Sequence, residues 1–303
     1  MDYSALRKFC TENRIPLTRD VPLSPLCTMR VGGRCDLMAS PRSEEALAAL
    51  YSLCVKERIP FFILGRGSNV LFPDEGYRGC IISVEALCGV RADGCIITAG
   101  AGAALSGVCR AALEHSLSGL EFAYGIPGSV GGALVMNAGA YGGEIKDVVL
   151  SCRCADENGV IHELTRDELR LSYRHSVFTE KGGCILSARF ALTKGDPAQI
   201  KARMSELMGR RRDKQPLDLP SCGSTFKRPE GYFAAALIEE CGLKGYAIGG
   251  AQVSEKHSGF VVNRGGATAR DIIALVEHIK NTVREEKGVE LECEMLIVDG
   301  ERR

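Results

Sequence analysis

The sequence predicts an α+β protein of two or three domains, and three observations support this. The chain has 303 residues, of which 45% are hydrophobic and 25% charged, so it can bury more than one core. Short apolar runs next to glycine predict strands over residues 60–65, 79–84 and 94–100, with helical patterns between and after them. The sequence pattern changes near residue 196, where a helical stretch begins after a series of short strand-like runs. We therefore place a domain boundary near residue 195.

Local signals define the other elements before that boundary. Ser43 is an N-cap candidate, because a serine hydroxyl can accept a hydrogen bond from a free N–H group in the first turn of a helix. The pair Asn158-Gly159 is a strong turn signal and predicts a hairpin over residues 148–164. The further elements expected are a helix over 3–12 followed by a linker, a strand near 35–38, a helix over 105–115 and a strand over 183–192.

The part of the chain after residue 195 has its own boundary signals. Asp196-Pro197 predicts the start of a helix, because proline suits the first turn, and Pro216 ends that helix. A long helix is expected from Thr268 to Gly288, since glycine favours the residue after a helix. The further elements expected are a helix over 232–241 that ends at Gly242, a strand over 259–263 and a strand over 289–298, in which Glu292 and Glu294 share one face.

Charge and cysteine usage exclude several classes of protein. The 38 basic and 38 acidic residues cancel, which argues against a nucleic-acid or membrane-surface binder. No apolar run reaches the ~20 residues of a membrane span, and the polar N-terminus does not resemble a secretory signal. The 14 cysteines are scattered without a C-x-x-C pair, so we expect no metal site. Reduced thiols in a cytoplasmic protein are the simplest interpretation.

The 35 glycines gather in two clusters, GRGSN at 65–69 and a glycine-rich stretch over 125–144. Glycine is costly in chain entropy, and consecutive amides in such a loop form a nest that binds anions. The first cluster lacks the third glycine of a dinucleotide-binding fingerprint, and the chain contains no Gly-Lys dipeptide of a Walker A loop. The clusters therefore predict a diphosphate site outside those folds, with ordinary tight turns as the alternative.

Three short segments carry residues suited to chemistry. Arg174, in Tyr173-Arg174-His175-Ser176, offers a fixed fork to a carboxylate, or else forms a surface ion pair. Ser224 follows glycine in a loop but lacks the G-x-S-x-G context of an acyl-transfer serine, so a turn serine is the alternative. Glu294 lies in the apolar run 291–298, where a carboxylate is either paired or functional unless its strand face is exposed.

Taken together, seven segments resemble the UDP-N-acetylenolpyruvoylglucosamine reductase (MurB) family. Their order and spacing are specific, and the resemblance covers about residues 20 to 298. The segments are TMRVGG (28–33), LGRGSNVLFPDEGYRG (64–79), GIPGSVGGALVMNAGAYGGE (125–144), YRHS (173–176), GSTFKRP (223–229), HSGFVVN (257–263) and ECEM (292–295).

This resemblance implies a vanillyl-alcohol-oxidase/PCMH-type FAD-binding domain of two α+β lobes and a C-terminal α+β substrate-binding domain. We assign residues 1–70 to the first lobe, 71–195 to the second and 196–303 to the C-terminal domain. Backbone N–H groups of the two glycine clusters would hold the FAD pyrophosphate. The cofactor-binding residues expected on this basis are Gly65, Arg66, Gly67, Ser68, Asn69, Gly128, Ser129, Val130, Gly131, Gly132, Asn137 and Ala138, of which Val130, Asn137 and Ala138 would lie near the flavin.

The family also implies a reaction. NADPH would reduce FAD, which would then reduce UDP-N-acetylglucosamine enolpyruvate to UDP-N-acetylmuramate for peptidoglycan synthesis. Arg174 would stabilise the enolate, Glu294 would assist it, and Ser224 would donate a proton to the α-carbon. The residues expected to bind substrate are Tyr173, Lys214 and Lys227. No obligate protein partner is expected.

Two departures and two alternatives complete the prediction. Leu296 stands where the family often has arginine, and the short stretch after Tyr173 lacks an inserted tyrosine-bearing loop, so the chain looks like the shorter, second subtype. Cys222, beside Ser224, is either a reactive thiol or a buried filler. The alternatives are another FAD oxidoreductase on the same fold, of the hydroxy-acid or lactone oxidase type, and a non-catalytic binder of flavin or sugar nucleotide.

Overall fold

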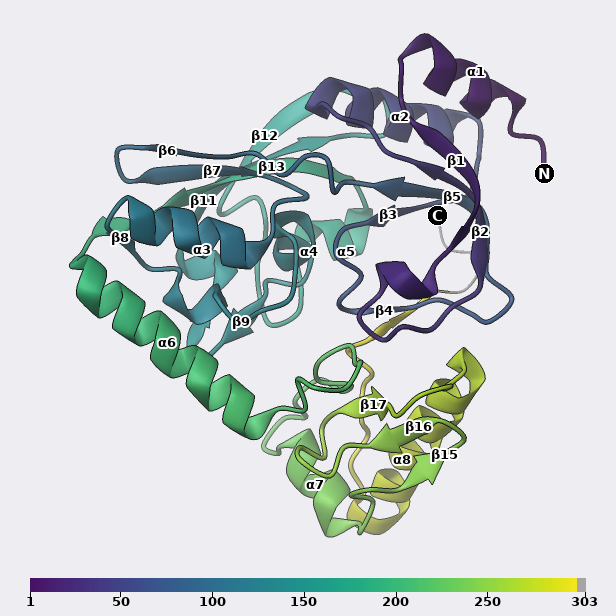
Figure 1. The fold of residues 1–303 in the computed structure, drawn as a ribbon, viewed down its shortest axis with the longest axis vertical. Coiled ribbons are helices and arrows are strands. Elements are labelled where there is room, and N and C mark those ends of the chain that lie inside the picture. The colour runs from purple at the N-terminus through teal and green to yellow at the C-terminus, as the bar shows by residue number, and fades with distance from the viewer. Residues whose placement is uncertain (299–303) are drawn as a thin grey trace.

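A computed structural model describes residues 1–298, in which two larger sheets stand above a smaller C-terminal layer (Figure 1). The first sheet has the strand order β1-β2-β5-β3. Strand β5 is parallel to both β2 and β3, whereas β1 is antiparallel to β2. These strands are β1 (Leu17–Pro22), β2 (Arg34–Ala39), β3 (Phe61–Leu64) and β5 (Tyr77–Ser83).

The second sheet is antiparallel throughout, with the order β12-β11-β13-β7-β6. Helices α3 and α4 contact it, and α6 packs against α3 and against β8, the strand that follows α3. The strands are β6 (Val90–Asp93), β7 (Ile96–Gly100), β11 (Val149–Ala155), β12 (Ile161–Thr165) and β13 (Cys184–Ala191). The neighbouring elements are α3 (Leu105–Glu114), β8 (Leu117–Ser118), α4 (Val130–Val135) and α6 (Pro197–Lys214).

Helix α2 (Glu44–Lys56) joins the two sheets. It contacts β11 and β13, and its buried residues share one hydrophobic core with residues of β2 and β5. Helix α1 (Ser4–Glu12) packs against α2 and closes the same core through Leu6 and Cys10. The two sheets of the FAD-binding part expected from the sequence therefore share one core, and the first sheet has a second core of its own.

The C-terminal layer is a three-stranded antiparallel sheet backed by helices α7 and α8 (Figure 1). Its core also includes Met29, Val31 and Leu71 from the N-terminal part of the chain. Asp74 accepts hydrogen bonds from the N–H groups of Ala269 (2.8 Å) and Arg270 (3.1 Å), at the start of α8. The layer is thus anchored to the first sheet at its helix end and in its core. Its elements are α7 (Ala234–Glu240), β15 (Ala247–Ile248), β16 (Ala251–Val253), β17 (Val261–Asn263) and α8 (Ala269–Lys287).

Short elements complete the chain. They are η1 (Ser24–Leu26), β4 (Val70–Leu71), η2 (Glu121–Ala123), β9 (Gly139–Ala140), β10 (Gly143–Glu144), η3 (Ile145–Asp147), α5 (Val177–Lys181), β14 (Thr193–Lys194) and β18 (Leu296–Ile297). Strand β10 pairs with β9, β14 with β8, and β18 with β4.

The predicted helix boundaries are confirmed where a cap defines them. Ser43 accepts a hydrogen bond from the N–H of Ala46, and Asp196 accepts one from Ala198 ahead of Pro197. Thr268 forms a capping box with Asp271, and the α8 helix ends at a left-handed Gly288. Predictions that rest on local hydrogen bonding therefore hold.

Two predictions are wrong. The expected linker after α1 contains strand β1, whose residues are mostly exposed and so lack the apolar alternation of a strand. Residues 289–298 form no continuous strand, because this segment leaves the C-terminal core at Met295 and enters the core of the first sheet at Val298. Glu292 and Glu294 consequently differ, with side chains 70% and 12% exposed.

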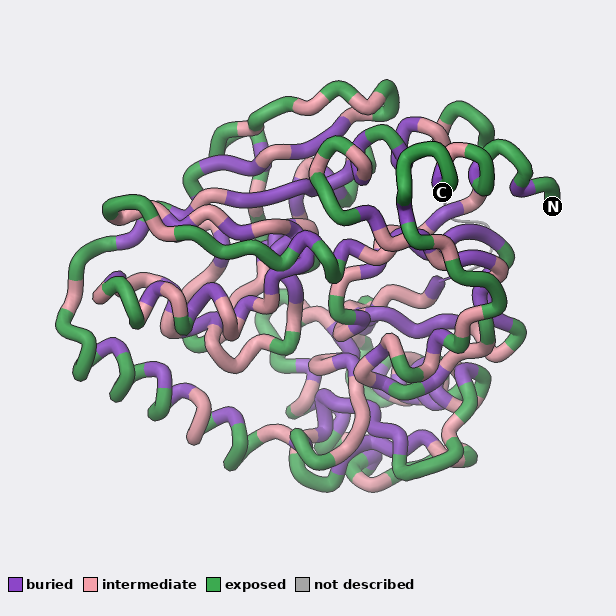
Figure 2. Tube along the Cα trace, turned by 45° about the horizontal axis from the view of Figure 1, so that its top comes forward, coloured by how far each residue is buried: buried purple, intermediate pink, exposed green. Residues whose placement is uncertain are grey.

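The domain boundaries at 70 and 195 remain predictions. In the structure, the first sheet continues through β5 to Ser83. Helix α6 lies against elements of the second sheet and shows alternating buried and exposed positions along its length (Figure 2). Residues 299–303 of the expected C-terminal domain lie outside the described residues.

Candidate functional site

The two glycine clusters meet in space. Gly65 follows β3, and Ser129 caps the N-terminus of α4. A Cβ atom on Gly65 would lie 2.2 Å from Ser129 Oγ, so only glycine permits this approach. Gly67 has a left-handed φ of 58°, and a Cβ there would lie 2.1 Å from the Leu26 carbonyl oxygen. This direct contact supports the prediction that both clusters belong to one site.

The first cluster offers free backbone donors. The N–H groups of Arg66, Gly67, Ser68 and Asn69 donate to no acceptor within residues 1–298. Gly67 is buried and Ser68 and Asn69 are half-buried, and such amides are normally hydrogen-bonded, so this consecutive run of free donors indicates an external partner. Such a run suits an anion, and a diphosphate supplies acceptor oxygens of that kind. The residues therefore fit an FAD diphosphate.

The second cluster is already partly hydrogen-bonded. Val130 and Gly131 donate their N–H groups to Ala103 and Ala101, and the Gly132 N–H donates to Ser129 Oγ at 3.3 Å. These three N–H groups are therefore not free to hold a pyrophosphate, contrary to the expectation. The loop 101–104 lies beside this cluster and was missed at the sequence level, although its run of alanine and glycine was a signal for close backbone approach.

Asn137 is fully buried, and its side chain is engaged within the protein. Its Nδ2 donates to Glu144 Oε2 at 3.1 Å and to the Ser172 carbonyl at 3.0 Å, while Oδ1 accepts from the Lys146 N–H. Asn137 thereby fixes Ser172, the residue before Tyr173. The Asn137 side chain is therefore already paired, and the contacts of Asn137 and the half-buried Ala138 with flavin stay predictions.

Arg174 and Glu294 form a largely buried ion pair. Reciprocal backbone bonds between Ser172 and His175 close a tight turn around Arg174, which has a left-handed φ of 55°. Arg174 Nε donates to Glu294 Oε1 at 2.5 Å, and the two side chains are 18% and 12% exposed. Four other arginines also have a left-handed φ, but all four are exposed, so it is burial beside a carboxylate that distinguishes Arg174.

Glu294 connects three predicted segments. Its N–H donates to the Thr225 carbonyl at 2.8 Å, and its own carbonyl accepts from Asn69 Nδ2 at 3.0 Å. Burial raises the pKa of Glu294, while Arg174 and then Lys227 act to lower it. The carboxylate is therefore held between a desolvating environment and a fixed cation.

Ser224 lies in the loop that pairs with Glu294. Its neighbour Thr225 is fixed by bonds from its N–H to Gly259 and to its hydroxyl from the Val261 N–H, both 2.9 Å long. The Ser224 hydroxyl is half-buried and bonds to no residue in the described part of the chain. The loop is thus rigid while this hydroxyl remains available to a ligand.

Comparison with known proteins agrees with this geometry. Residues 35–165 match the family model of an FAD binding domain, and residues 215–298 match the C-terminal domain of UDP-N-acetylenolpyruvoylglucosamine reductase. A reductase of that name from Clostridium perfringens (strain SM101 / Type A) is 49% identical over 296 residues, which cover 98% of this chain and 97% of that protein. The chain belongs to the UDP-N-acetylenolpyruvoylglucosamine reductase family.

Other members and solved structures support the assignment to this reductase family. The protein of the same name from Clostridium novyi is 53% identical over 274 residues, covering 90% of this chain and 89% of its own. The Thermus caldophilus reductase structure superposes with a TM-score of 0.80 at 33% identity, covering 94% and 99% of the two chains. Berberine bridge enzyme from Eschscholzia californica shares the fold alone, with a TM-score of 0.51 at 16% identity over 63% of this chain and 44% of that one. The predicted family and FAD-binding fold are confirmed.

Of the three residues expected to bind the reductase substrate, two lie with the site and one has no contact that ties it there. The Tyr173 hydroxyl accepts a hydrogen bond from the Arg228 N–H at 3.0 Å, which links the Arg174 turn to the Ser224 loop. Lys227 forms an ion pair with Glu292 and is half-buried. Lys214 is exposed at the end of α6 and forms no ion pair within residues 1–298. Tyr173 and Lys227 thus lie with the site, whereas no contact ties Lys214 to it in the described part of the chain.

Cys222 is buried filler in this reductase fold. Its Sγ donates to the Val70 carbonyl at 3.2 Å, and burial raises the pKa of the thiol to about 12. All 14 cysteines are free, and no cluster of three or more potential metal ligands occurs among the described residues. No helix in the described part of the chain is long and apolar enough to cross a membrane.

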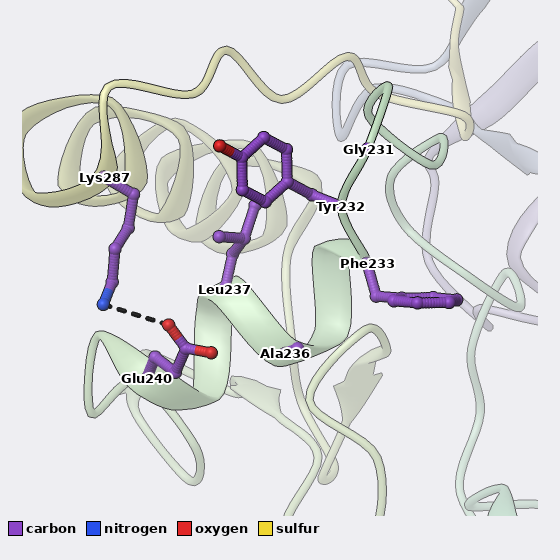
Figure 3. Close-up of a pocket in the computed structure, with 7 residues that line it drawn as sticks. All are labelled: Gly231, Tyr232, Phe233, Ala236, Leu237, Glu240 and Lys287. Carbon is purple, nitrogen blue, oxygen red and sulfur yellow. Dashed lines mark ion pairs between the residues drawn. The ribbon is translucent and has the colours of Figure 1, made fainter.

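A surface pocket of about 300 Å³ lies between α7 and α8, and neither Arg174 nor Glu294 lines it (Figure 3). Lys287 Nζ and Glu240 Oε2 pair across it at 3.1 Å. Phe233 is one of the lining residues and is exposed, and the Arg228 guanidinium lies over its ring at 4.7 Å. No predicted site residue lines the pocket.

Proposed function

We propose that this protein is an FAD-dependent reductase that uses NADPH to convert UDP-N-acetylglucosamine enolpyruvate into UDP-N-acetylmuramate, for peptidoglycan precursor synthesis. The observation that carries the proposal is the buried Arg174–Glu294 pair, held beside both the Ser224 loop and Asn69 of the first glycine cluster. These residues come from four segments of the predicted reductase pattern.

The cofactor would lie along the first glycine cluster. The free N–H groups of residues 66–69 would hold its diphosphate, and the Gly65–Ser129 approach would bring the second cluster alongside. When bound, FAD would supply the redox chemistry, in which a hydride taken from NADPH is passed to the enolpyruvyl methylene carbon. The protein supplies binding, orientation and electrostatics around that transfer.

Arg174 would stabilise the negative charge that develops on the enolate and its carboxylate. Its guanidinium is already oriented by Glu294 at 2.5 Å, so little reorganisation is needed when charge appears. Glu294 would keep the Arg174 guanidinium in place. Because burial raises the pKa of Glu294, its carboxyl group can also hold a proton near the reacting atoms.

Ser224 would donate the proton to the α-carbon. Its hydroxyl sits in a rigid loop next to Thr225, which is bonded to the Glu294 backbone. A serine hydroxyl is a weak acid, so it can serve only a strongly basic enolate and needs a relay to restore its proton. Tyr173, Lys214 and Lys227 would bind the substrate, with the lysines directed to its phosphates.

We further propose that the enzyme works in the cytoplasm without an obligate protein partner. The 14 free cysteines support a reducing compartment. The shared core of the two sheets and the anchored C-terminal layer support an independently folded chain.

The purified protein should be yellow and carry FAD. NADPH should bleach the flavin absorption under anaerobic conditions, and the enolpyruvyl sugar nucleotide should restore it with one equivalent of UDP-N-acetylmuramate formed. Reoxidation by a hydroxy acid or lactone in place of that substrate would favour an oxidase of the same fold. Flavin that NADPH never reduces would remove the proposal.

A further inference from the structure

Helix α6 buries an arginine where its pattern calls for an apolar side chain. The buried positions of the helix are Ile200, Met204, Leu207 and Arg211, which recur at spacings of four, three and four. Such a stripe is normally apolar along its whole length. Arg211 is nevertheless only 9% exposed, so the last position of the stripe carries a largely buried side chain whose guanidinium nitrogens still reach the surface.

This guanidinium has no partner in the described protein. Arg211 makes no ion pair, and its side chain makes no hydrogen bond, within residues 1–298. Burial lowers the pKa of Arg211, with the ring hydroxyl of Tyr141 as the one group acting against that. An unpaired charge on a largely buried side chain is costly, so its retention points to an anionic or electron-rich group that the chain itself does not supply.

Gly125, the first residue of the second glycine cluster, lies against Arg211. A Cβ atom on Gly125 would lie 3.0 Å from Arg211 Cδ and 3.9 Å from Arg211 Nε, so the glycine makes room for this side chain. Three residues later, Gly128 and Ser129 lie against the first cluster. Arg211 is therefore placed at the border of the predicted cofactor site.

A second unpaired group belongs to Gln215, the residue that caps the C-terminus of α6. Gln215 Oε1 is buried and has no hydrogen-bond donor in the described protein. A ligand that bound both the guanidinium and this amide oxygen would need both an acceptor and a donor. A diphosphate has acceptors only, and the free N–H groups of residues 66–69 already suit it. The pyrimidine edge of the isoalloxazine ring presents carbonyl oxygens and an N–H group side by side.

We propose that Arg211 binds the pyrimidine edge of the flavin and stabilises the negative charge that this edge gains on reduction, with Gln215 accepting from its N–H. The proposal rests on the FAD dependence stated above and adds a residue that makes the bound flavin easier to reduce. Arg211 thereby serves the NADPH half-reaction, whereas Arg174 serves the substrate half-reaction.

The test is the midpoint potential of FAD in the holoenzyme, measured by equilibration with a reference dye under a chemical reductant instead of NADPH. Arg211→Met continues the apolar stripe and removes the charge. We expect it to weaken binding of reduced FAD relative to oxidised FAD by at least tenfold, a fall of about 30 mV for a two-electron couple. Arg211→Lys, which keeps the charge without the fork, should show a smaller fall and carries the test if the methionine variant does not fold.

Arg210→Met is the matched control. Arg210 is the preceding residue of α6, is 55% exposed and pairs with Glu206, so its replacement should leave the potential unchanged. The dissociation constant of oxidised FAD is measured in parallel by flavin fluorescence on dilution. Weaker binding of oxidised FAD with an unchanged potential would place Arg211 on the diphosphate and overturn the assignment to the ring.

No change in either quantity would show that Arg211 does not touch the cofactor, and would also overturn the proposal. Because the reductant is chemical, a shifted potential supports Arg211 even if the enolpyruvyl substrate were not turned over. A wild-type protein that binds no FAD would instead contradict the proposed function.

Discussion

Replacing Arg174 by methionine tests the reasoning on the buried ion pair. The substitution leaves the Glu294 carboxylate, 12% exposed, without the partner that now lies 2.5 Å away. Two charge centres about 4 Å apart attract by about 4 kcal/mol at an effective dielectric constant near 20, and breaking a buried pair costs about 3–5 kcal/mol. Both side chains are well under one-third exposed, so solvent screening is modest. We expect the free energy of unfolding to fall by about 3 kcal/mol at pH 8.

The loss should depend on pH, with a defined sign. Burial raises the pKa of Glu294, and Arg174 is the largest influence that lowers it, so the variant should raise this pKa further. A carboxyl with a raised pKa in the folded state favours folding at low pH and loses that contribution as the pH rises through the unfolded value toward the folded one. The deficit of Arg174→Met relative to wild type should therefore be smaller at pH 5 than at pH 8.

The assay is urea unfolding of the holoprotein at both pH values, with the same excess of FAD throughout, because ligand binding adds to apparent stability. Arg170→Met is the control, since Arg170 is exposed and pairs with an exposed Glu180, and it should change stability by less than about 0.5 kcal/mol at either pH. Equal losses at pH 5 and pH 8 for Arg174→Met would refute the reasoning.

In stopped-flow experiments, the same variant should retain flavin reduction by NADPH and slow flavin reoxidation by substrate about 10²–10³-fold.

Three further predictions concern the loops. Ser224→Ala should keep flavin reduction by NADPH and slow the substrate half-reaction about 10²–10⁴-fold in stopped-flow absorption, and normal turnover would remove Ser224 from the mechanism. Gly65→Ala should weaken FAD binding at least about tenfold by fluorescence titration, because its Cβ would lie 2.2 Å from Ser129 Oγ; adding Ser129→Gly should restore part of the affinity. Gly107→Ala, in open space within a helix, is its control and should raise stability by about 0.5–1 kcal/mol. Cys222 should resist a thiol-alkylating reagent at pH 8 in the folded protein, as its thiol has a pKa of about 12; rapid labelling by mass spectrometry would contradict its burial.

Local chemistry explains which elements could be predicted. Ser43, Asp196 and Thr268 cap their helices as expected, because a cap is decided by a few neighbouring residues. The strand Leu17–Pro22 escaped prediction, since an exposed edge strand needs no apolar alternation. The strand predicted over 289–298 is absent as a continuous element, because the apolar residues of this segment pack into two different cores rather than on one strand face.

The residues of the candidate site were likewise predictable only in part. Arg174, Ser224, Glu294 and the first glycine cluster could be selected from residue type and order, and the structure gathers them around Glu294. Arg211 could not be selected, since one arginine among several in GRRRDK gives no sign that it alone is buried.

The sequence by itself determined the family, the helix caps and the residue types on which the chemistry rests, because these depend on short-range patterns and their order. Only the tertiary structure decided which charges meet. Arg174 and Glu294 lie 120 positions apart in the chain, and their pairing depends on the burial that packing imposes. It also decided that the amides of residues 66–69 and the guanidinium of Arg211 have no partner in the described protein, since whether a polar group is satisfied depends on every element that folds around it.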